Sequence, residues 1–268
     1  MADKSSMLDR LLPNGRGVWI PMDHGVSDYP VLGLDDTESR INELIKAGVD
    51  VIIAQKGLVS HYSSLMKSSN VSTSFVIHFS ISTRHGGPDA SNKVLVGEAD
   101  EVLSRGAFGA SAQINMGSPN EAVMIERMGS LSRDCHNLGI PLLGMVYARG
   151  ENLKPIEGDS SNCGAHAARL AFEIGCDVAK VSWTGNEDAL RMIRKAVPIP
   201  ILITPGTGIT NDLELLGLVE KGIKLGANGV CMGRSVFGHK SPQRIATALR
   251  LIVHENKSAV QAHELAGL

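Results

Sequence analysis

Residues 175–183 read Gly175-Cys176-Asp177-Val178-Ala179-Lys180-Val181-Ser182-Trp183, and this segment has the pattern of a β-strand. Apolar residues at helical spacing precede it at 163–174 and follow it at 187–196. A strand between two helices belongs to a parallel sheet, where strands are buried on both faces and are almost continuously apolar. The segment therefore predicts an α/β fold, and Lys180 is out of place in it.

The same alternation extends over the chain in both directions. Strand patterns occur at 18–23, 49–55, 74–79, 110–115, 141–147, 177–183, 199–204 and 229–233. Helical patterns occur at 35–47, 58–66, 98–105, 120–138, 163–174, 187–196, 211–225 and 242–254. This alternation predicts a closed (β/α)8 barrel, the TIM barrel. We expect one extra short strand at 93–96 and loops at 86–92 and 150–161.

An open doubly wound sheet is the alternative architecture. It would place a glycine-rich nucleotide motif after the first strand, and Met22-Asp23-His24-Gly25-Val26 supplies none. A chain of 268 residues has the usual size of a one-domain barrel. No linker or shift in composition marks a second domain. We expect a single domain over 1–268, with its core at about 16–256.

Composition excludes several classes of partner and compartment. The formal net charge is −2 without a basic stripe, which argues against nucleic acid or a membrane surface as partner. The first residues lack the apolar run of a signal peptide, and no segment approaches transmembrane length. Cys135, Cys163, Cys176 and Cys231 have no disulfide-framework or zinc spacing. We expect a cytoplasmic protein that uses no metal and no cofactor.

In a barrel the chemistry lies at the carboxyl ends of the strands. The polar residues expected at these strand ends are Asp23, Lys56, Tyr147, Arg149, Lys180 and Arg234. Burial of Lys180 would lower its pKa and make the neutral amine available, as in enzymes that form a Schiff base. The alternative is a strand-end lysine whose ammonium lies in solvent or pairs with a carboxylate.

Glycine turns follow the last two strands. Gly206 and Gly208 follow the strand at 199–204, and Gly233 precedes Arg234 after the strand at 229–233. Backbone N–H groups in such turns bind phosphate in many barrels, and an arginine adds charge-assisted hydrogen bonds. The alternative is that these glycines only permit tight turns.

Three other polar residues have simpler interpretations. Lys56 is a second candidate nucleophile, but we expect it at the solvent-exposed edge of its strand. His24 and Asp23, as neighbours in a strand, would point to opposite faces, so His24 is more easily structural than a metal ligand. His78 is expected to be a hydrogen-bonded core histidine.

Several strand ends together resemble a known family. These are Pro21-Met22-Asp23-His24-Gly25-Val26-Ser27, Tyr147-Ala148-Arg149-Gly150, Asp177-Val178-Ala179-Lys180, Ser182-Trp183-Thr184-Gly185 and Gly233-Arg234-Ser235-Val236-Phe237. They resemble the class I aldolases of the archaeal fructose-bisphosphate aldolase type. Within it the chain is most similar to the 2-amino-3,7-dideoxy-D-threo-hept-6-ulosonate synthases and bacterial relatives of secondary metabolism.

The resemblance implies roles for particular residues. Lys180 matches the Schiff-base lysine, Tyr147 the general acid/base and Asp23 the assisting carboxylate. Gly206, Gly233 and Arg234 match positions that hold substrate phosphate, and Arg149 belongs to the matching strand end. These roles agree with the chemistry, since imine formation and C–C cleavage both need a proton donor and acceptor.

The chain also departs from the family pattern. Pro205-Gly206-Thr207-Gly208 replaces Gly-Gly-Pro-Lys, so one backbone donor and a lysine are lost, and phosphate binding then depends on the Thr204 and Thr207 hydroxyls. Ile81 replaces a small glycine and is expected to narrow the pocket. Met145 stands where the fructose-bisphosphate enzymes tend to have tryptophan, which favours the heptulosonate type.

The resemblance implies a Schiff-base aldolase or transaldolase. It would join a phosphorylated keto compound to a small aldehyde, L-aspartate semialdehyde, giving an amino-keto-heptanoate precursor of aromatic compounds. A fructose-bisphosphate aldolase and a non-catalytic phospho-sugar binding barrel are the alternatives. The resemblance also implies a homo-oligomer, a decamer built from pentamers.

Overall fold

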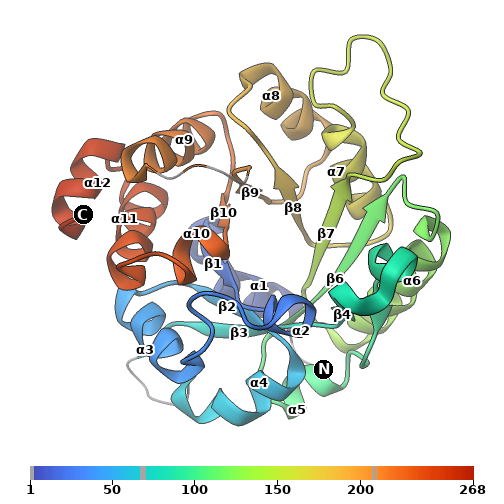
Figure 1. The fold of residues 1–268 in the computed structure, drawn as a ribbon, viewed down its shortest axis with the longest axis horizontal. Helices are drawn as coiled ribbons and strands as arrows, with labels where there is room; N and C mark the ends of the chain where they lie inside the picture. Colours follow the sequence, from blue (N-terminus) through green and yellow to red (C-terminus); the bar gives the residue numbers. More distant parts are fainter. Residues whose placement is uncertain (1–2, 67–70, 207–208, 210) are drawn as a thin grey trace.

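The barrel predicted from the alternating pattern is present. The computed structural model describes residues 3–66, 71–206, 209 and 211–268. The barrel strands are β1 (Gly17–Pro21), β2 (Val51–Ala54), β3 (Ser74–His78), β6 (Gly109–Met116), β7 (Leu142–Ala148), β8 (Val178–Ser182), β9 (Ile201–Thr204) and β10 (Gly229–Cys231). They close in the order β1-β10-β9-β8-β7-β6-β3-β2, and the neighbours are parallel (Figure 1).

Helices surround this barrel and connect its strands (Figure 1). They are α3 (Thr37–Ala47), α4 (Lys56–Tyr62), α5 (Glu101–Ser104), α6 (Glu121–Leu138), α7 (Gly164–Glu173), α8 (Glu187–Ala196), α9 (Asp212–Lys224) and α11 (Pro242–Glu255). Their starts follow capping chemistry: the side chains of Asp36, Asn186 and Asn211 accept hydrogen bonds from backbone N–H groups of α3, α8 and α9. Of the described helices, none is long and apolar enough to cross a membrane.

Further elements stand outside the alternating pattern. Helices α1 (Lys4–Leu11), α2 (Gly25–Asp28), α10 (Arg234–Phe237) and α12 (Ala259–Ala266) were not predicted, and α1 and α12 lie beyond the expected core limits. Short 3₁₀ turns occur as η1 (Pro13–Gly15), η2 (Ser63–Met66) and η3 (Arg84–Ser91). The extra strand is confirmed as β5 (Val94–Leu95), which pairs antiparallel with β4 (Ser80–Ile81) outside the barrel. The helix expected at 98–105 is confined to the single turn of α5, Glu101–Ser104.

The apolar residues form two cores, one on each side of the barrel wall. On β1, Val18 and Ile20 pack outward against the helices, whereas Trp19 packs inside the barrel. This division follows from the strand period of two. Inside, side chains such as Val51, Val76 and Leu202 fill the barrel, so its lower part is a packed core.

Helix α1 closes the bottom of the barrel. Leu11 and Leu12 belong to the interior cluster, and Leu11 is completely buried. The backbone carbonyl of Leu11 accepts a hydrogen bond from the indole Nε1 of Trp19 at 2.9 Å. Because the bottom is sealed in this way, the interior of the barrel opens at the other end, where the strands finish.

Candidate active site

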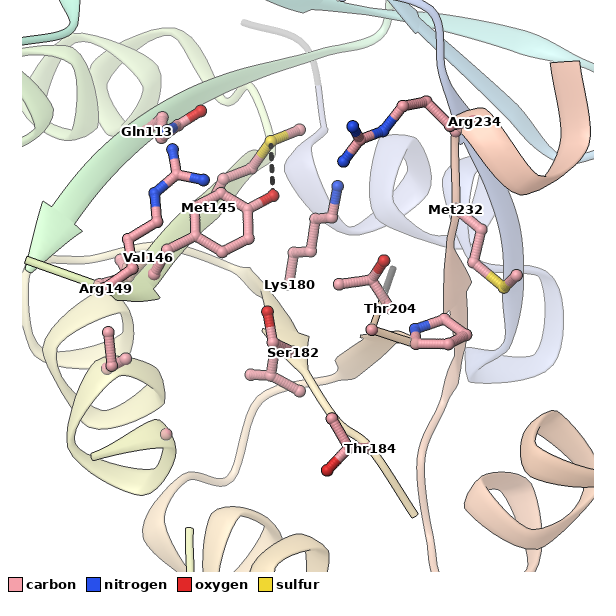
Figure 2. Close-up of a pocket in the computed structure, with 18 of the residues that line it drawn as sticks. Gln113, Met145, Val146, Arg149, Lys180, Ser182, Thr184, Thr204, Met232 and Arg234 are labelled. Carbon is pink, nitrogen blue, oxygen red and sulfur yellow. Dashed lines mark hydrogen bonds between the residues drawn. The ribbon is translucent and has the colours of Figure 1, made fainter. Parts of the chain in front are cut away.

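Lys180 lies on the inner face of the barrel near its open end. On β8, Val178 packs inside, and Lys180 two positions later points the same way. The side chain is only 7% exposed. Figure 2 shows it projecting into a cavity of about 1080 Å³, which is large enough for a metabolite.

Tyr147 lies beside Lys180 because β7 and β8 are neighbours. Met145 pairs with Lys180 in the parallel register, which places Tyr147 one step nearer the open end. The Lys180 Nζ atom is 5.8 Å from the centroid of the Tyr147 ring. The phenol donates only a weak contact to the Met145 sulfur, with Oη and Sδ 4.0 Å apart. The hydroxyl is therefore available to a ligand.

Asp23 follows β1 and faces two histidines. Its Oδ2 is 3.7 Å from Nε2 of His78, and its Oδ1 is 3.7 Å from Nδ1 of His24. Burial opposes the charged carboxylate, but His78, His24 and Lys180 outweigh it, so the pKa of Asp23 lies below its usual value. Asp23 Oδ1 and His24 Nδ1 are buried without a hydrogen-bond partner. Such atoms are rare in folded proteins and are often found where a ligand binds.

The electrostatic state of Lys180 differs from the prediction. Burial favours the neutral amine, but the negative charges of Cys231, Tyr147 and Asp23 outweigh burial, so the pKa of Lys180 is raised. The prediction of a lowered pKa is wrong. Because burial raises the pKa of the Cys231 thiol to about 11, this thiol is uncharged near neutral pH. Asp23 is the carboxylate among these groups, and its negative charge raises the pKa of Lys180.

His78 is a hydrogen-bonded core histidine, as predicted. It is 1% exposed, and its Nδ1 lies 2.7 Å from Oγ of Ser111 on β6. Burial lowers the pKa of His78 to about 4, although Asp23 works in the opposite direction. The ring is therefore neutral near pH 7 and presents Nε2 to Asp23.

A second group of polar side chains lies on β6 and β7. Asn115 Oδ1 accepts hydrogen bonds from Nε of Arg149 at 2.9 Å and from Nε2 of Gln113 at 2.8 Å. The guanidinium of Arg149 also lies over the Tyr147 ring, with Cζ 4.7 Å from its centroid. This network orients Arg149 and brings a positive charge close to the phenol.

The predicted phosphate-binding residues lie across the cavity from this network. Thr204, Gly206, Gly233 and Arg234 line it, and Figure 2 shows Arg234 and Arg149 on opposite sides of Lys180. Gly233 has a packing requirement of its own, because a Cβ there would lie 2.6 Å from the backbone oxygen of Pro21. Gly208 and Thr207 fall outside the described residues. The structure thus brings together every predicted site residue that it describes.

Comparison with known proteins agrees with this geometry. Residues 18–239 match the DeoC/LacD family aldolase profile. Over 267 residues the chain is 33% identical to the 2-amino-3,7-dideoxy-D-threo-hept-6-ulosonate synthase of Halobacterium salinarum, with 100% of this chain and 97% of the relative covered. The chain belongs to the DeoC/LacD aldolase family. The predicted resemblance and the prediction of an aldolase-type enzyme are confirmed.

Other relatives of this aldolase extend the comparison. The chain is 31% identical over 248 residues to 2-amino-4,5-dihydroxy-6-oxo-7-(phosphonooxy)heptanoate synthase of Streptomyces griseus, covering 92% of this chain and 88% of the relative. An archaeal fructose 1,6-bisphosphate aldolase structure superposes with a TM-score of 0.80 at 24% identity, covering 94% of this chain and 100% of that one. The fructose-bisphosphate aldolase structure of Slackia heliotrinireducens superposes with a TM-score of 0.83 at 20% identity, covering 98% of this chain and 89% of that one. At these identities the structural likeness concerns the fold.

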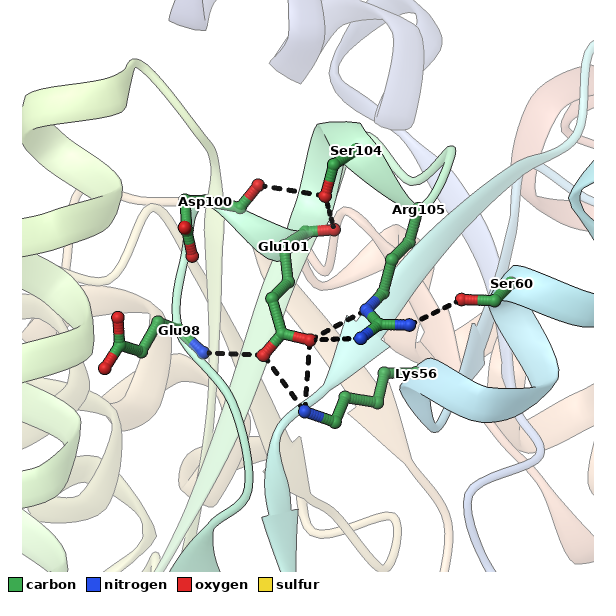
Figure 3. Close-up of polar contacts among 7 residues, drawn as sticks. All are labelled: Lys56, Ser60, Glu98, Asp100, Glu101, Ser104 and Arg105. Carbon is green, nitrogen blue, oxygen red and sulfur yellow. Dashed lines mark hydrogen bonds and ion pairs between the residues drawn. The ribbon is translucent and has the colours of Figure 1, made fainter.

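Lys56, the alternative nucleophile, forms an ion pair with Glu101. It is the first residue of α4, not an exposed strand edge, and its Nζ is 3.0 Å from both carboxylate oxygens of Glu101 (Figure 3). Arg105 contacts the same carboxylate. Lys56 does not line the cavity around Lys180. Its geometry therefore favours a structural role.

Two further expectations need correction. β1 ends at Pro21, so strand alternation no longer applies to Asp23 and His24, and their side chains face each other, not opposite sides. Ile81 does not narrow the pocket, because it pairs with Val94 in the β4–β5 hairpin and is not among the cavity-lining residues. Its neighbours Ser80 and Ser82 line the cavity instead.

Sequence reasoning missed the polar residues of β6. Ser111, Gln113 and Asn115 alternate with Ala112 and Ile114, which pack outward. In a barrel strand this period of two places all three polar side chains inside. The alternation was the available signal, because an inward row of polar residues near the end of a strand indicates a ligand site.

Proposed function

We propose that this aldolase forms a Schiff base between Lys180 and the ketone of a phosphorylated three-carbon donor, then joins that donor to L-aspartate semialdehyde. The observation that carries the proposal is the buried amine of Lys180 beside the phenol of Tyr147 and the carboxylate of Asp23. An amine, a proton shuttle and a carboxylate in one cavity are the groups that imine chemistry requires.

The names of the two relatives support this pair of substrates. Both describe seven-carbon acids with an amino group at carbon 2 and a ketone at carbon 6. In the phosphorylated compound, the aldol bond joins carbons 4 and 5. Cleavage there gives dihydroxyacetone phosphate and L-aspartate semialdehyde. The unphosphorylated compound carries the same four-carbon amino acid end, so the acceptor is the shared part.

Each catalytic residue has a defined task in the proposed reaction. Lys180 gives up its proton, and its amine attacks the donor ketone to form a carbinolamine. Tyr147 then protonates the carbinolamine hydroxyl, which leaves as water to give the iminium. The resulting Tyr147 phenolate takes a proton from the adjacent carbon, and the enamine so formed attacks the aldehyde. Asp23 stabilises the positive charge on Lys180, and we assign to Asp23 or Tyr147 the role of receiving its proton.

The phosphate end of the donor is assigned to the β9–β10 side. Arg234 and Thr204 supply a charge-assisted and a neutral hydrogen bond, and the backbone of Gly206 and Gly233 lies beside them. Pro205 donates no backbone hydrogen bond, so we propose that the two side chains carry more of the binding than the turn does.

Covalent trapping tests the proposal. With dihydroxyacetone phosphate and borohydride, the wild-type protein should gain the mass of the reduced donor on one lysine. Lys180→Met should fold and gain no label, since it replaces the amine with an apolar chain of similar length. Lys56→Met is the matched control and should be labelled as wild type.

The outcomes separate the candidate functions. Labelling that persists in Lys180→Met would move the nucleophile elsewhere. An unlabelled wild-type protein would favour the non-catalytic binding barrel. Product masses from a panel of aldehydes would distinguish a heptanoate synthase from a fructose-bisphosphate aldolase.

We also propose a cytoplasmic homo-oligomer, with a decamer built from pentamers as the expected form. All four cysteines are buried thiols without a disulfide, which is typical of a reducing compartment. Exposed apolar side chains, among them Leu32 at 82% and Ile156 at 76%, are available for subunit contacts. Sedimentation of a stable monomer at micromolar concentration would contradict the assembly.

A further inference from the structure

A second cationic wall of the cavity is built by the hairpin that follows β3. Strands β4 and β5 pair antiparallel, with Ile81 opposite Val94, so that Ser82 and Lys93 are the next residues beyond the pair. Lys93 Nζ donates a hydrogen bond to Ser82 Oγ at 2.6 Å. Ser82 Oγ in turn donates to the carbonyl of Ala90 at 2.8 Å. The hairpin therefore holds the Lys93 ammonium in a fixed place at the cavity wall.

Lys93 and Arg149 act on the same part of the cavity. Both residues line the cavity. Burial is the largest cause that lowers the pKa of Lys93, and the nearby positive charge of Arg149 lowers it further. Among the described side chains, no carboxylate lies within ion-pair distance of either cation. Arg149 donates from Nε to Asn115, so among the described residues its two outer nitrogens remain available to a ligand in the cavity that it lines. Two adjacent cations held in this way fit an anionic group of a ligand.

The position of this wall identifies which end of the ligand it meets. Arg149 and Arg234 flank Lys180 from opposite sides (Figure 2). If the donor phosphate binds at Arg234, the new carbon–carbon bond forms near Lys180 and Tyr147, and the acceptor extends toward Arg149. The far end of that acceptor then reaches the wall made by Lys93.

We propose that Lys93, with Arg149, binds the carboxylate of the acceptor aldehyde and selects short aldehydes that carry an anionic end. The inference rests on the proposed function and adds an acceptor subsite to it. Lys93 is a specificity-determining residue in this assignment, because its ammonium lies on the hairpin wall while the reacting carbon meets Lys180. A phosphate group on the aldehyde would also be an anion that these cations could bind, so the test includes a phosphorylated aldehyde.

The test measures kcat and KM of Lys93→Met with dihydroxyacetone phosphate as donor. The acceptors are L-aspartate semialdehyde, D-glyceraldehyde 3-phosphate and the neutral aldehyde propanal. Loss of one charge-assisted hydrogen bond should raise KM for L-aspartate semialdehyde about 10- to 100-fold. With propanal, kcat/KM should stay within about twofold of wild type. Lys93→Arg should restore part of the affinity for the anionic acceptor.

Lys154→Met is the control for loss of an exposed lysine charge, because Lys154 does not line the cavity. It should leave all three acceptors unchanged. An equal loss on propanal would show that Lys93 only supports the structure, and an unchanged KM for L-aspartate semialdehyde would place the carboxylate elsewhere. A loss confined to glyceraldehyde 3-phosphate would overturn the carboxylate assignment in favour of phosphate.

Borohydride labelling of Lys93→Met with the donor alone separates this inference from the proposed function. The labelling should equal that of the wild-type protein, since the donor does not reach the hairpin wall. A wild-type protein that is not labelled refutes the proposed function. A labelled protein whose acceptor preference ignores Lys93 refutes only the acceptor subsite.

Discussion

At the scale of single residues, the phenol of Tyr147 has the environment of a proton shuttle. Its ring lies between the guanidinium of Arg149 and the ammonium of Lys180, with the cations 4.7 and 5.8 Å from its centroid. Both cations lie within cation–π range of the ring. The hydroxyl donates a weak contact to the Met145 sulfur, and its side-chain hydrogen bond with Lys180 is one cause of the raised pKa of that lysine.

Tyr147→Phe tests this role. The ring and its packing remain, and only the hydroxyl is lost. Positioned acid/base groups contribute about 10²–10⁴-fold in rate, so kcat for aldol formation should fall by that factor. A trapped imine with the donor should still accumulate slowly, because Lys180 is intact. Near-normal turnover would reduce the phenol to a packing role and make Asp23 the leading acid/base.

At the scale of elements, helix α1 and the strand β1 depend on each other. Leu11 closes the barrel bottom with no exposed surface, and its carbonyl accepts from Trp19. Arg10 adds a hydrogen bond from Nε to the hydroxyl of Ser74 at the start of β3, at 2.8 Å. A helix outside the repeating β/α pattern thus takes part in the barrel core.

Leu11→Ala should therefore destabilise the aldolase by about 2–5 kcal/mol, the usual range for a leucine removed from a core. Leu265→Ala is the matched control, because Leu265 also lies in a short terminal helix but is 64% exposed. Its effect should stay within about 0.5 kcal/mol. Urea denaturation followed by circular dichroism measures both, and equal effects would show that α1 does not seal the core.

At the scale of the whole molecule, burial of the histidines next to Asp23 links folding to pH. The pKa of His78 is lowered from 6.5 to about 4, with burial as the largest cause, and the pKa of His24 is lowered for the same reason. Between these values the unfolded chain binds protons that the folded barrel does not. The contribution of these two histidines to stability should thus be constant above about pH 7 and fall as the pH drops toward 4.

His78→Asn tests this dependence. From the shift of His78 alone, the wild-type barrel should lose about 2 kcal/mol between pH 7 and pH 5. The variant begins less stable, because it loses the contact with Ser111, but its stability should change less over the same interval. Urea denaturation midpoints at both pH values measure the change. If wild type and variant lose the same stability between pH 7 and pH 5, His78 is not the titrating group.

The sequence by itself determined the barrel and indicated candidate site residues, which the structure places around one cavity. Strand and helix periods are local properties, and eight repeats of them leave few closed arrangements. Because side chains alternate along a strand, Lys180 lies on the same face as Val178, and its place late in the predicted strand puts it near the carboxyl end. The matching strand ends then indicated the aldolase family, which the comparisons confirm.

Only the tertiary structure decided the electrostatics and the walls of the cavity. The raised pKa of Lys180 depends on Cys231 of β10 and on Asp23, which follows β1, and burial alone predicts the opposite direction. The place of Lys93 at the cavity depends on the pairing of β4 with β5, two short strands that lie outside the repeating pattern. Charge and hydrogen bonding act through space between residues distant in sequence, so they become known only when the strands are placed side by side.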